Sequence, residues 1–335
     1  MTDQGKINRE GARPASLFER ADAAFGLDPR EGGLKLPPVT AKLPPVPQAL
    51  RRQAPAPQAA PAAQAAAAAA PQPVSAPQPA PASPPSPQPR AVTFSGPFAH
   101  IDREHLREGG LIVPEDAVTG LLEEFRIVKR ELLADARTGA SGLARRILVC
   151  SPHTGEGKTY CAMNLAIALA AERGLEVVLV DADVVQPSIT DRLGIEAGDG
   201  LMDALADPAI LPESLVIRTD IEGLFVLPAG RATSRDAESL ASTRTAEVRD
   251  RLTQGAPDRI LIFDTPPALA ASPAAELAKH VGQALLVVRA DETSRAALED
   301  AQQLLSACGD IKLLLNAARY SPSGRRFGSY GAKGK

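Results

Sequence analysis

The hydrophobic pattern of the second half of the chain is that of a fold in which strands and helices alternate. From about residue 145 onward, stretches with helical spacing separate apolar runs of strand length, which are RRILVC, VVLVDAD, LFVLPAG, RILIFDTPP, ALLVVRA and IKLLLNA. Such runs predict a mostly parallel sheet that helices cover on both faces. A sheet of this kind binds its ligands at the carboxyl ends of its strands.

Two helices are predicted around the first of these runs. One is expected over residues 115–136, where the apolar residues share one face and the charged side chains of Glu123, Arg126 and Lys129 lie largely off it. The other is expected from Lys158 to about residue 173, directly after the first strand and its loop.

The N-terminal part of the chain has a different character. Residues 1–31 are polar, and a short apolar periodicity at 15–26 predicts either a transient helix or a docking peptide. From about residue 32 to residue 90 the chain is mostly Pro, Ala and Gln, a composition that predicts a disordered, extended linker, and we place the linker at residues 32–98. We therefore expect one folded domain over residues 99–318, followed by a flexible tail at 319–335.

Composition narrows the class of function. The formal net charge is −3, so no strongly basic balance indicates a nucleic-acid partner. The N-terminus lacks the apolar core of a secretory signal, and no run approaches the roughly 20 apolar residues of a membrane span. Cys150, Cys161 and Cys308 lack metal-ligand spacing and are expected to be buried or idle thiols. These features together predict a cytoplasmic protein.

The sequence S-P-H-T-G-E-G-K-T, from Ser151 to Thr159, has the features of a phosphate-binding loop. Gly155 and Gly157 let backbone amides turn toward phosphate oxygens at the start of a helix. Lys158 is suited to bridge the outer phosphates, and the hydroxyl of Thr159 is suited to bind magnesium. Pro152 stands where the strict G-x-x-x-x-G-K-[ST] pattern has its first glycine. The loop predicts a site for a nucleoside triphosphate with magnesium.

Carboxylates follow two of the other apolar runs. Asp181 and Asp183 end VVLVDAD, and Asp264 ends RILIFD. Carboxylates beside a phosphate loop are suited to hold magnesium or to accept a proton from an attacking hydroxyl. The structural alternative for each is a loop or helix cap.

Asn316, at the end of the last apolar run, is expected either to read the nucleotide base or to form a turn. We expect the nucleotide to contact Gly155, Glu156, Gly157, Lys158, Thr159, Tyr160 and Asn316. His153 is expected to face solvent.

These three motifs in this order resemble the bacterial tyrosine kinases, the BY-kinase family of capsule and exopolysaccharide synthesis. The resemblance covers roughly residues 99–318, and LLEEFRIVKRELL, VDADVVQPSITDRLG and VGQALLVVRADET are similar to segments of the exosortase-associated tyrosine autokinases. It implies a SIMIBI-like P-loop NTPase fold with ATP and magnesium as cofactors.

The resemblance also implies roles for individual residues. Lys158, Asp181, Asp183 and Asp264 would be catalytic, with Asp181 as general base and with Thr159, Asp183 and Asp264 in the magnesium shell. A helical E-x-x-R-x-x-R motif builds rings in the family. It reads Glu123, Arg126 and Lys129 here, and lysine lacks the planar fork of arginine.

The tail departs from the family pattern. The family usually ends in a tyrosine cluster that neighbouring subunits phosphorylate, whereas this chain has three tyrosines in all. Tyr160 lies on the helix after the phosphate loop and is expected to be structural rather than a phosphate acceptor. This leaves Tyr320 and Tyr330 as acceptors. By resemblance the partner is a Wzz-type chain-length-determinant membrane protein, which would hold the chain peripherally at the inner membrane.

Two alternative functions stay open at this stage. The first is an ATP-binding regulator or scaffold of polysaccharide export with little kinase activity, which the sparse tail favours. The second is a ParA/MinD-type ATPase. In that family a signature lysine stands five positions before the phosphate lysine, and His153 occupies this position here.

Overall fold

The structure is a computed structural model that describes residues 90–138, 142–233 and 235–318. All of them belong to one compact unit, which spans Pro81–Lys335. The predicted segments at 1–31 and 319–335 and most of the linker therefore lie outside the described residues, as do Tyr320 and Tyr330. Within the described ranges, no helix combines the length and apolarity that a membrane crossing needs.

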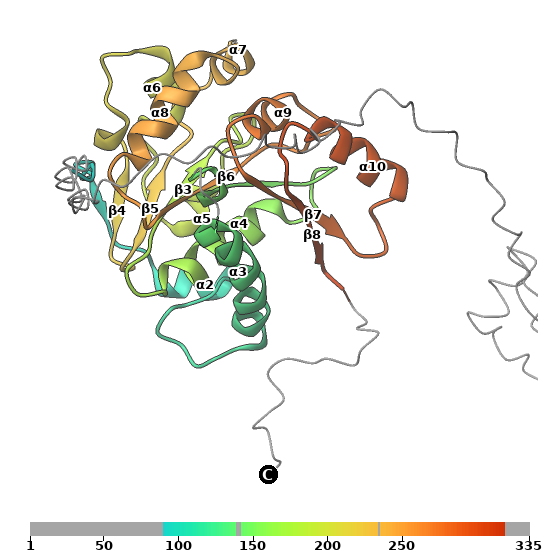
Figure 1. Ribbon diagram of the computed structural model, residues 1–335. Helices are drawn as coiled ribbons and strands as arrows, with labels where there is room; N and C mark the ends of the chain where they lie inside the picture. The colour runs from blue at the N-terminus through green and yellow to red at the C-terminus, as the bar shows by residue number, and fades with distance from the viewer. Residues whose placement is uncertain (1–89, 139–141, 234, 319–335) are drawn as a thin grey trace, which may run out of the picture. The chain divides into compact units, whose positions relative to one another are not determined.

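The centre of the unit is an eight-stranded sheet with the strand order β1-β4-β5-β3-β6-β2-β7-β8 (Figure 1). All neighbouring strands are parallel except β4 and β5. The prediction of a mostly parallel sheet is therefore confirmed. The strands are β1 Phe98–Ala99, β2 Arg146–Cys150, β3 Glu176–Asp181, β4 Ile217–Thr219, β5 Leu224–Leu227, β6 Arg259–Asp264, β7 Gln283–Arg289 and β8 Ile311–Asn316.

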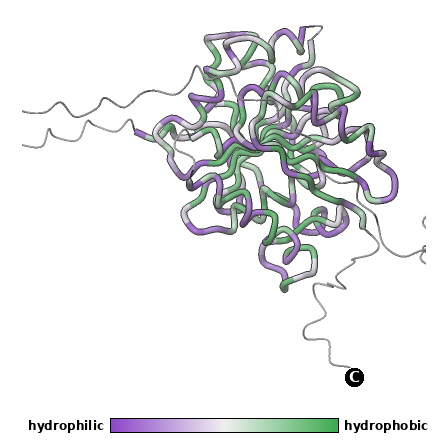
Figure 2. Tube along the Cα trace, turned by 45° about the vertical axis from the view of Figure 1, so that its right-hand side comes forward, coloured by the Kyte–Doolittle hydropathy of each residue, from purple (hydrophilic) through white to green (hydrophobic). Residues whose placement is uncertain are grey.

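Helices cover both faces of this sheet, as the sequence predicted. The apolar side chains of four helices join one core cluster, and these helices are α2 Arg103–Glu108, α3 Gly120–Thr138, α4 Lys158–Ala170 and α5 Ile189–Leu193. Those of the remaining five join the cluster on the opposite face, namely α6 Leu201–Ala206, α7 Asp236–Leu240, α8 Thr243–Thr253, α9 Pro273–Ala278 and α10 Arg295–Leu304. Figure 2 shows the resulting arrangement, in which hydrophobic strands run through the middle.

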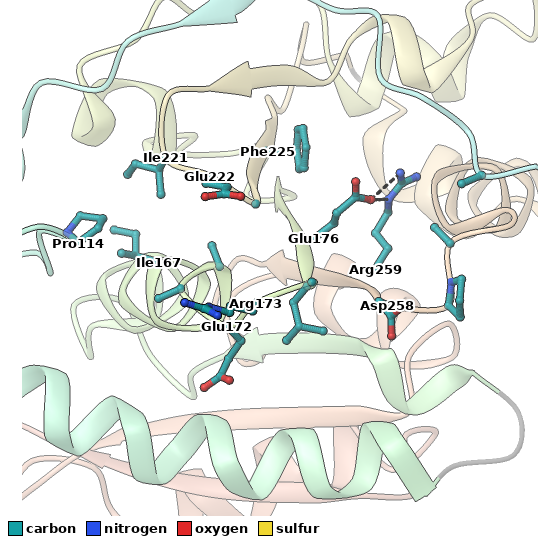
Figure 3. Close-up of a pocket in the computed structure, with 18 of the residues that line it drawn as sticks. Pro114, Ile167, Glu172, Arg173, Glu176, Ile221, Glu222, Phe225, Asp258 and Arg259 are labelled. Carbon is teal, nitrogen blue, oxygen red and sulfur yellow. Dashed lines mark hydrogen bonds and ion pairs between the residues drawn. The ribbon is translucent and has the colours of Figure 1, made fainter.

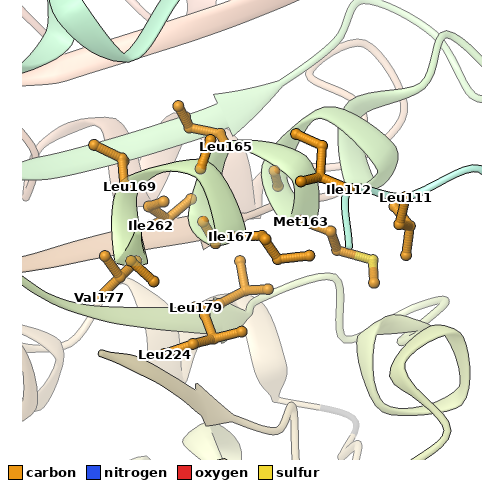
Figure 4. Close-up of a cluster of buried hydrophobic side chains, with 14 of the residues drawn as sticks. Leu111, Ile112, Met163, Leu165, Ile167, Leu169, Val177, Leu179, Leu224 and Ile262 are labelled. Carbon is orange, nitrogen blue, oxygen red and sulfur yellow. The ribbon is translucent and has the colours of Figure 1, made fainter. Parts of the chain in front are cut away.

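Helix α4 is the central helix of its layer. It is apolar around most of its circumference, so it must be covered on the side away from the sheet as well. Leu165, Ile167 and Leu169 are buried in the same cluster as Leu179 of β3 and Ile262 of β6 (Figure 4). Helix α3 covers α4 with the apolar face predicted from the sequence.

Both predicted helices are shorter than expected at one end. Helix α3 begins at Gly120 rather than at Glu115, because Glu115 pairs with Arg103 of α2 at 2.9 Å and the hydroxyl of Thr119 accepts a hydrogen bond from the Leu122 amide at 3.2 Å. Helix α4 ends at Ala170 rather than near residue 173, and Gly174 then turns the chain with φ +80°.

The folded unit begins earlier than the predicted boundary at residue 99. The amide of Val92 donates to the carbonyl of Gln254 at 3.0 Å. The Phe94 ring is buried and meets the Phe225 ring edge-on, with 4.9 Å between the centroids. The composition changes near Val92, but these residues belong to no long periodic element, so no pattern in the sequence predicted that they are folded.

Candidate functional site

The loop between β2 and α4 has the backbone of an anion site. Gly155 and Gly157 have φ values of +83° and +95°, which side chains with a Cβ rarely allow. Gly157 is the N-cap of α4 and no side chain caps the helix there, so the amides of the first turn are left for a ligand. His153 is exposed, as predicted.

Lys158 and Thr159 follow the glycines at the start of α4, and Lys158 faces the acidic residue Asp183. The ammonium of Lys158 lies 2.7 Å from the Oδ2 atom of Asp183. Asp183 also accepts a hydrogen bond from the amide of Gln186 at 3.1 Å. The structure therefore brings together the phosphate loop and the second predicted motif.

Asp181 and Asp264 stand opposite each other in the sheet. They are register partners in the parallel pair of β3 and β6. Because side chains alternate along a strand, both point to the same face as Leu179 and Ile262, which is the face that α4 covers. The sheet thus places both carboxylates beside the start of α4.

Asp264 is the strongest candidate for a metal ligand. Its side chain is 1% exposed, and neither carboxylate oxygen has a hydrogen-bond partner among the described residues. Burial raises the pKa of Asp264 to about 7, against the effect of the positive charge of Lys158. A buried carboxylate with free lone pairs fits a hard cation such as magnesium.

No group of three or more His, Cys, Asp or Glu side chains in the described ranges could hold a metal ion by itself. Magnesium usually keeps waters and binds through one or two carboxylates and the phosphates of a nucleotide. The assignment of Thr159, Asp183 and Asp264 as magnesium ligands stays a prediction.

Asp181 has a structural role in this state. Its Oδ2 atom accepts hydrogen bonds from the amides of Ser188 and Ile189, both at 3.1 Å, at the start of α5. Burial raises the pKa of Asp181 to about 6, and these backbone amides oppose that rise. The cap predicted as the alternative is thus present, and the general-base role stays a prediction.

Three members of the predicted nucleotide set turn their side chains toward the protein. The hydroxyl of Tyr160 donates to the carbonyl of Gly110 at 2.8 Å, because the first turn of α4 packs on the segment after α2. The carboxylate of Glu156 is buried within the loop. The amide of Asn316 donates to the carbonyl of Glu156 at 2.8 Å, so it binds the loop in this state.

The predicted oligomerisation motif on α3 is also occupied within the chain. The ammonium of Lys129 is 2.8 Å from the carbonyl of Ala168 and 2.7 Å from the carboxylate of Glu172, and its side chain is 11% exposed. Glu123 and Arg126 form an ion pair with each other. Lys129 therefore joins α3 to the C-terminal end of α4, and a contact with another subunit stays a prediction.

Arg289 and Thr293 complete the surroundings of the loop, and the sequence did not single them out. Arg289 ends β7 and donates to the carbonyl of Gly155 at 3.3 Å, while the hydroxyl of Thr293 donates to the carboxylate of Glu156. They lie at the carboxyl end of β7, where the ligand sites of such sheets gather, but the pairing of β7 with β2 is known only from the fold.

A cavity of about 680 Å³ lies at the other end of the sheet (Figure 3). It is lined by the starts of β3 and β6, where Glu176 pairs with Arg259 at 2.7 Å. This position at the amino ends of the strands separates the cavity from the phosphate loop, so it is not the nucleotide site.

Comparisons with known proteins agree with the geometry. A ParA family model, described as "NUBPL iron-transfer P-loop NTPase", matches residues 142–236, which include the loop and the Asp181–Asp183 motif. The "Putative tyrosine-protein kinase EpsB" of Ralstonia solanacearum is 30% identical over 225 residues, which are 65% of this chain and 28% of that protein. The chain thus spans little more than a quarter of the length of this relative.

Two further relatives match most of their own length. The "Tyrosine-protein kinase YwqD" of Bacillus subtilis is 29% identical over 191 residues, which are 56% of this chain and 78% of that protein. The kinase domain of the Escherichia coli tyrosine kinase ETK has the same fold, with a TM-score of 0.51 at 20% identity over 66% of this chain and 97% of that domain. Neither name distinguishes the exosortase-associated group, so that finer assignment stays a prediction. The resemblance drawn from the three motifs is nevertheless confirmed, and this chain is similar to the bacterial tyrosine kinases in sequence and to their kinase domain in fold.

Proposed function

We propose that this chain is an ATP-dependent protein-tyrosine autokinase that regulates exopolysaccharide synthesis or export. The observation that carries the proposal is the placement of Lys158, Asp183 and Asp264 around the glycine loop, together with the similarity to named tyrosine-protein kinases. In this proposal residues 1–31 and the linker precede the kinase domain, and the tail at 319–335 carries the acceptors Tyr320 and Tyr330.

The chemistry follows from positioning and charge. The loop amides and Lys158 would hold the β- and γ-phosphates of ATP, and Thr159, Asp183 and Asp264 would hold magnesium. Magnesium, when bound, neutralises the charge that develops on the phosphates. The hydroxyl of a tail tyrosine from an adjacent subunit attacks the γ-phosphorus in line, so that the new O–P bond forms as the bond to ADP breaks. Asp181 accepts the proton of the tyrosine hydroxyl.

The proposed setting is the cytoplasmic face of the inner membrane. A Wzz-type chain-length-determinant protein would hold the chain there, and copies of the chain would form a ring in which one tail reaches the next site.

The test is to incubate the purified chain with ATP and magnesium and to map phosphorylated residues by mass spectrometry. We expect phosphate on Tyr330 or Tyr320 in the wild type and none in the Lys158→Met variant. ATP hydrolysis without phosphate on either tyrosine would contradict the autokinase proposal.

The second candidate is an ATP-binding regulator of polysaccharide export with little kinase activity. The count of three tyrosines in the whole chain favours it, because Tyr160 is bound to Gly110 and only two acceptors remain. A Tyr320→Phe/Tyr330→Phe double variant that still supports polymer production would favour the regulator over the autokinase.

A further inference from the structure

Side chains at the carboxyl ends of β7 and β8, two neighbouring strands, form hydrogen bonds with the phosphate loop. We propose that Glu156 and Thr293 are positioning residues, whose hydrogen bond keeps the loop in the shape that receives phosphate and so sets the affinity for the nucleotide. This inference deepens the proposed function, since it concerns the same nucleotide site. It assigns to Glu156 a role other than direct contact with the nucleotide.

Glu156 is a buried acid inside a glycine loop. Its side chain is 5% exposed, although it lies between two glycines at the edge of the molecule. One carboxylate oxygen accepts a hydrogen bond from the amide of His153 at 2.7 Å, and the other accepts one from the hydroxyl of Thr293. The first bond closes the loop on itself, and the second ties it to the segment between β7 and α10.

Thr293 is placed to hold this carboxylate in one direction. Its hydroxyl accepts a hydrogen bond from the amide of Arg289 at 2.8 Å, so its own proton is directed toward Glu156. Arg289 ends β7, whose position next to β2 is fixed by the sheet. The position of the Glu156 carboxylate is therefore set by the segment after β7 as well as by the loop itself.

Two backbone carbonyls of the loop are bound in the same way. Arg289 donates to the carbonyl of Gly155 at 3.3 Å, and Asn316 at the end of β8 donates to the carbonyl of Glu156 at 2.8 Å. Carbonyls held toward β7 and β8 leave the amides of the same peptide units facing the opposite side, where the phosphate binds. The contacts thus orient the loop amides without occupying them.

Because the loop contains two glycines, contacts from outside the loop are needed to order it. Gly155 and Gly157 allow the left-handed backbone of the loop, but glycine also loses the most conformational freedom when it is ordered. A loop that is ordered before the nucleotide arrives does not lose that freedom on binding. Removing the hold should therefore weaken nucleotide binding even though no contact to the nucleotide is lost.

The experiment compares Thr293→Val with Thr293→Ser. Valine keeps the shape of threonine but lacks the hydroxyl, whereas serine keeps the hydroxyl. Thr245→Val is the matched control, because it removes the hydroxyl of a buried threonine, which donates to the carbonyl of Leu240 at 2.9 Å in the α7–α8 region. Affinity is measured with a fluorescent N-methylanthraniloyl ATP analogue and magnesium, and loop order is measured by hydrogen exchange of residues 152–160 without nucleotide.

We expect Thr293→Val to weaken binding of the analogue about tenfold, the effect of losing one hydrogen bond to a charged group. It should also speed exchange in the loop. Thr293→Ser should stay within about twofold of the wild type, a difference well below that of one hydrogen bond. Thr245→Val should lower the melting temperature and leave both loop exchange and affinity unchanged.

Wild-type affinity and loop exchange in Thr293→Val would overturn the proposal, and so would a Thr293→Ser variant as weak as the valine variant. If the wild-type chain bound no nucleotide, the proposed function would fail. The hold on the loop would still be tested, because the exchange measurement uses the protein without nucleotide.

Discussion

Replacing Phe94 by alanine should destabilise the whole folded unit, although the residue lies in the segment that the sequence assigned to the linker. The ring is 5% exposed and belongs to the core cluster on the face covered by α8. The guanidinium carbon of Arg259 lies 4.1 Å from the ring centroid, and Phe225 meets its edge. Truncation would remove both contacts and leave a cavity.

The expected loss of unfolding free energy is about 3 kcal/mol. Burial of phenylalanine in a core is worth about 3–5 kcal/mol against alanine, and we take the low end because the segment lies at the start of the unit and relaxes more easily. Arg259 keeps its carboxylate partner Glu176 at 2.7 Å and its bond to the carbonyl of Val92 at 2.8 Å, so the variant leaves no unpaired buried charge. A loss of this size is a large part of the total stability of about 5–15 kcal/mol of a typical domain.

Urea unfolding followed by far-ultraviolet circular dichroism measures the effect, with Phe98→Ala as the matched control. Phe98 lies on the edge strand β1 and is 52% exposed, so its removal should cost less than about 1 kcal/mol. Equal losses in the two variants, or a loss below about 1 kcal/mol for Phe94→Ala, would refute the view that residues 92–98 are part of the folded unit.

The remaining predictions concern the nucleotide site. Lys158→Met should weaken ATP binding at least about tenfold, because it removes the only side-chain cation of the loop between residues 151 and 159. Calorimetry measures the affinity, and an unchanged value would contradict the role of Lys158 in phosphate binding. Gly157→Ala should prevent both binding and the loop geometry, since a Cβ there would lie 2.2 Å from the Nδ2 atom of Asn316 at a φ of +95°; ATP binding like that of the wild type would refute this. Asp264→Asn should abolish magnesium-dependent binding yet stabilise the protein without nucleotide. The folded-state pKa of Asp264 is about 7 against an ordinary 3.8, so the wild type loses stability as the pH rises between these values. The gain of the variant should therefore grow over that window to at most about 4 kcal/mol in urea titrations, and a gain independent of pH would count against this account.

The part of the fold that the sequence predicted is the part with strong local patterns. The long apolar strands β3, β6 and β7 are buried on both faces, so each reads as a continuous run of Val, Leu and Ile. The strands β1 and β4 are only two and three residues long, and no periodicity can indicate an element of that length. Their existence depends on pairing with each other and with β5, which only the tertiary structure decides.

The candidate site likewise has a part that the sequence predicted and a part that it did not. The residue types suited to bind phosphate and magnesium lie in three short motifs at strand ends, so the sequence indicated them as candidates. The hydrogen bond from Thr293 to Glu156 was not predictable, because 137 positions separate the two residues along the chain. Only the parallel order of β2 and β7 brings the two together. The sequence likewise could not tell that Asp181 caps α5, since the same carboxylate is suited to a cap and to a base.

Lys129 illustrates how one position can serve two requirements. The family resemblance places it in a motif for contacts between subunits, whereas its ammonium here binds Ala168 and Glu172 near the C-terminus of α4. A cation at this end of a helix satisfies a free carbonyl and favours the negative end of the helix dipole. Helix α4 carries the phosphate loop at its other end. If copies of this chain assemble through the predicted motif, Glu123 and Arg126 are its more exposed members, and an ion pair across the interface would replace the one that they form with each other.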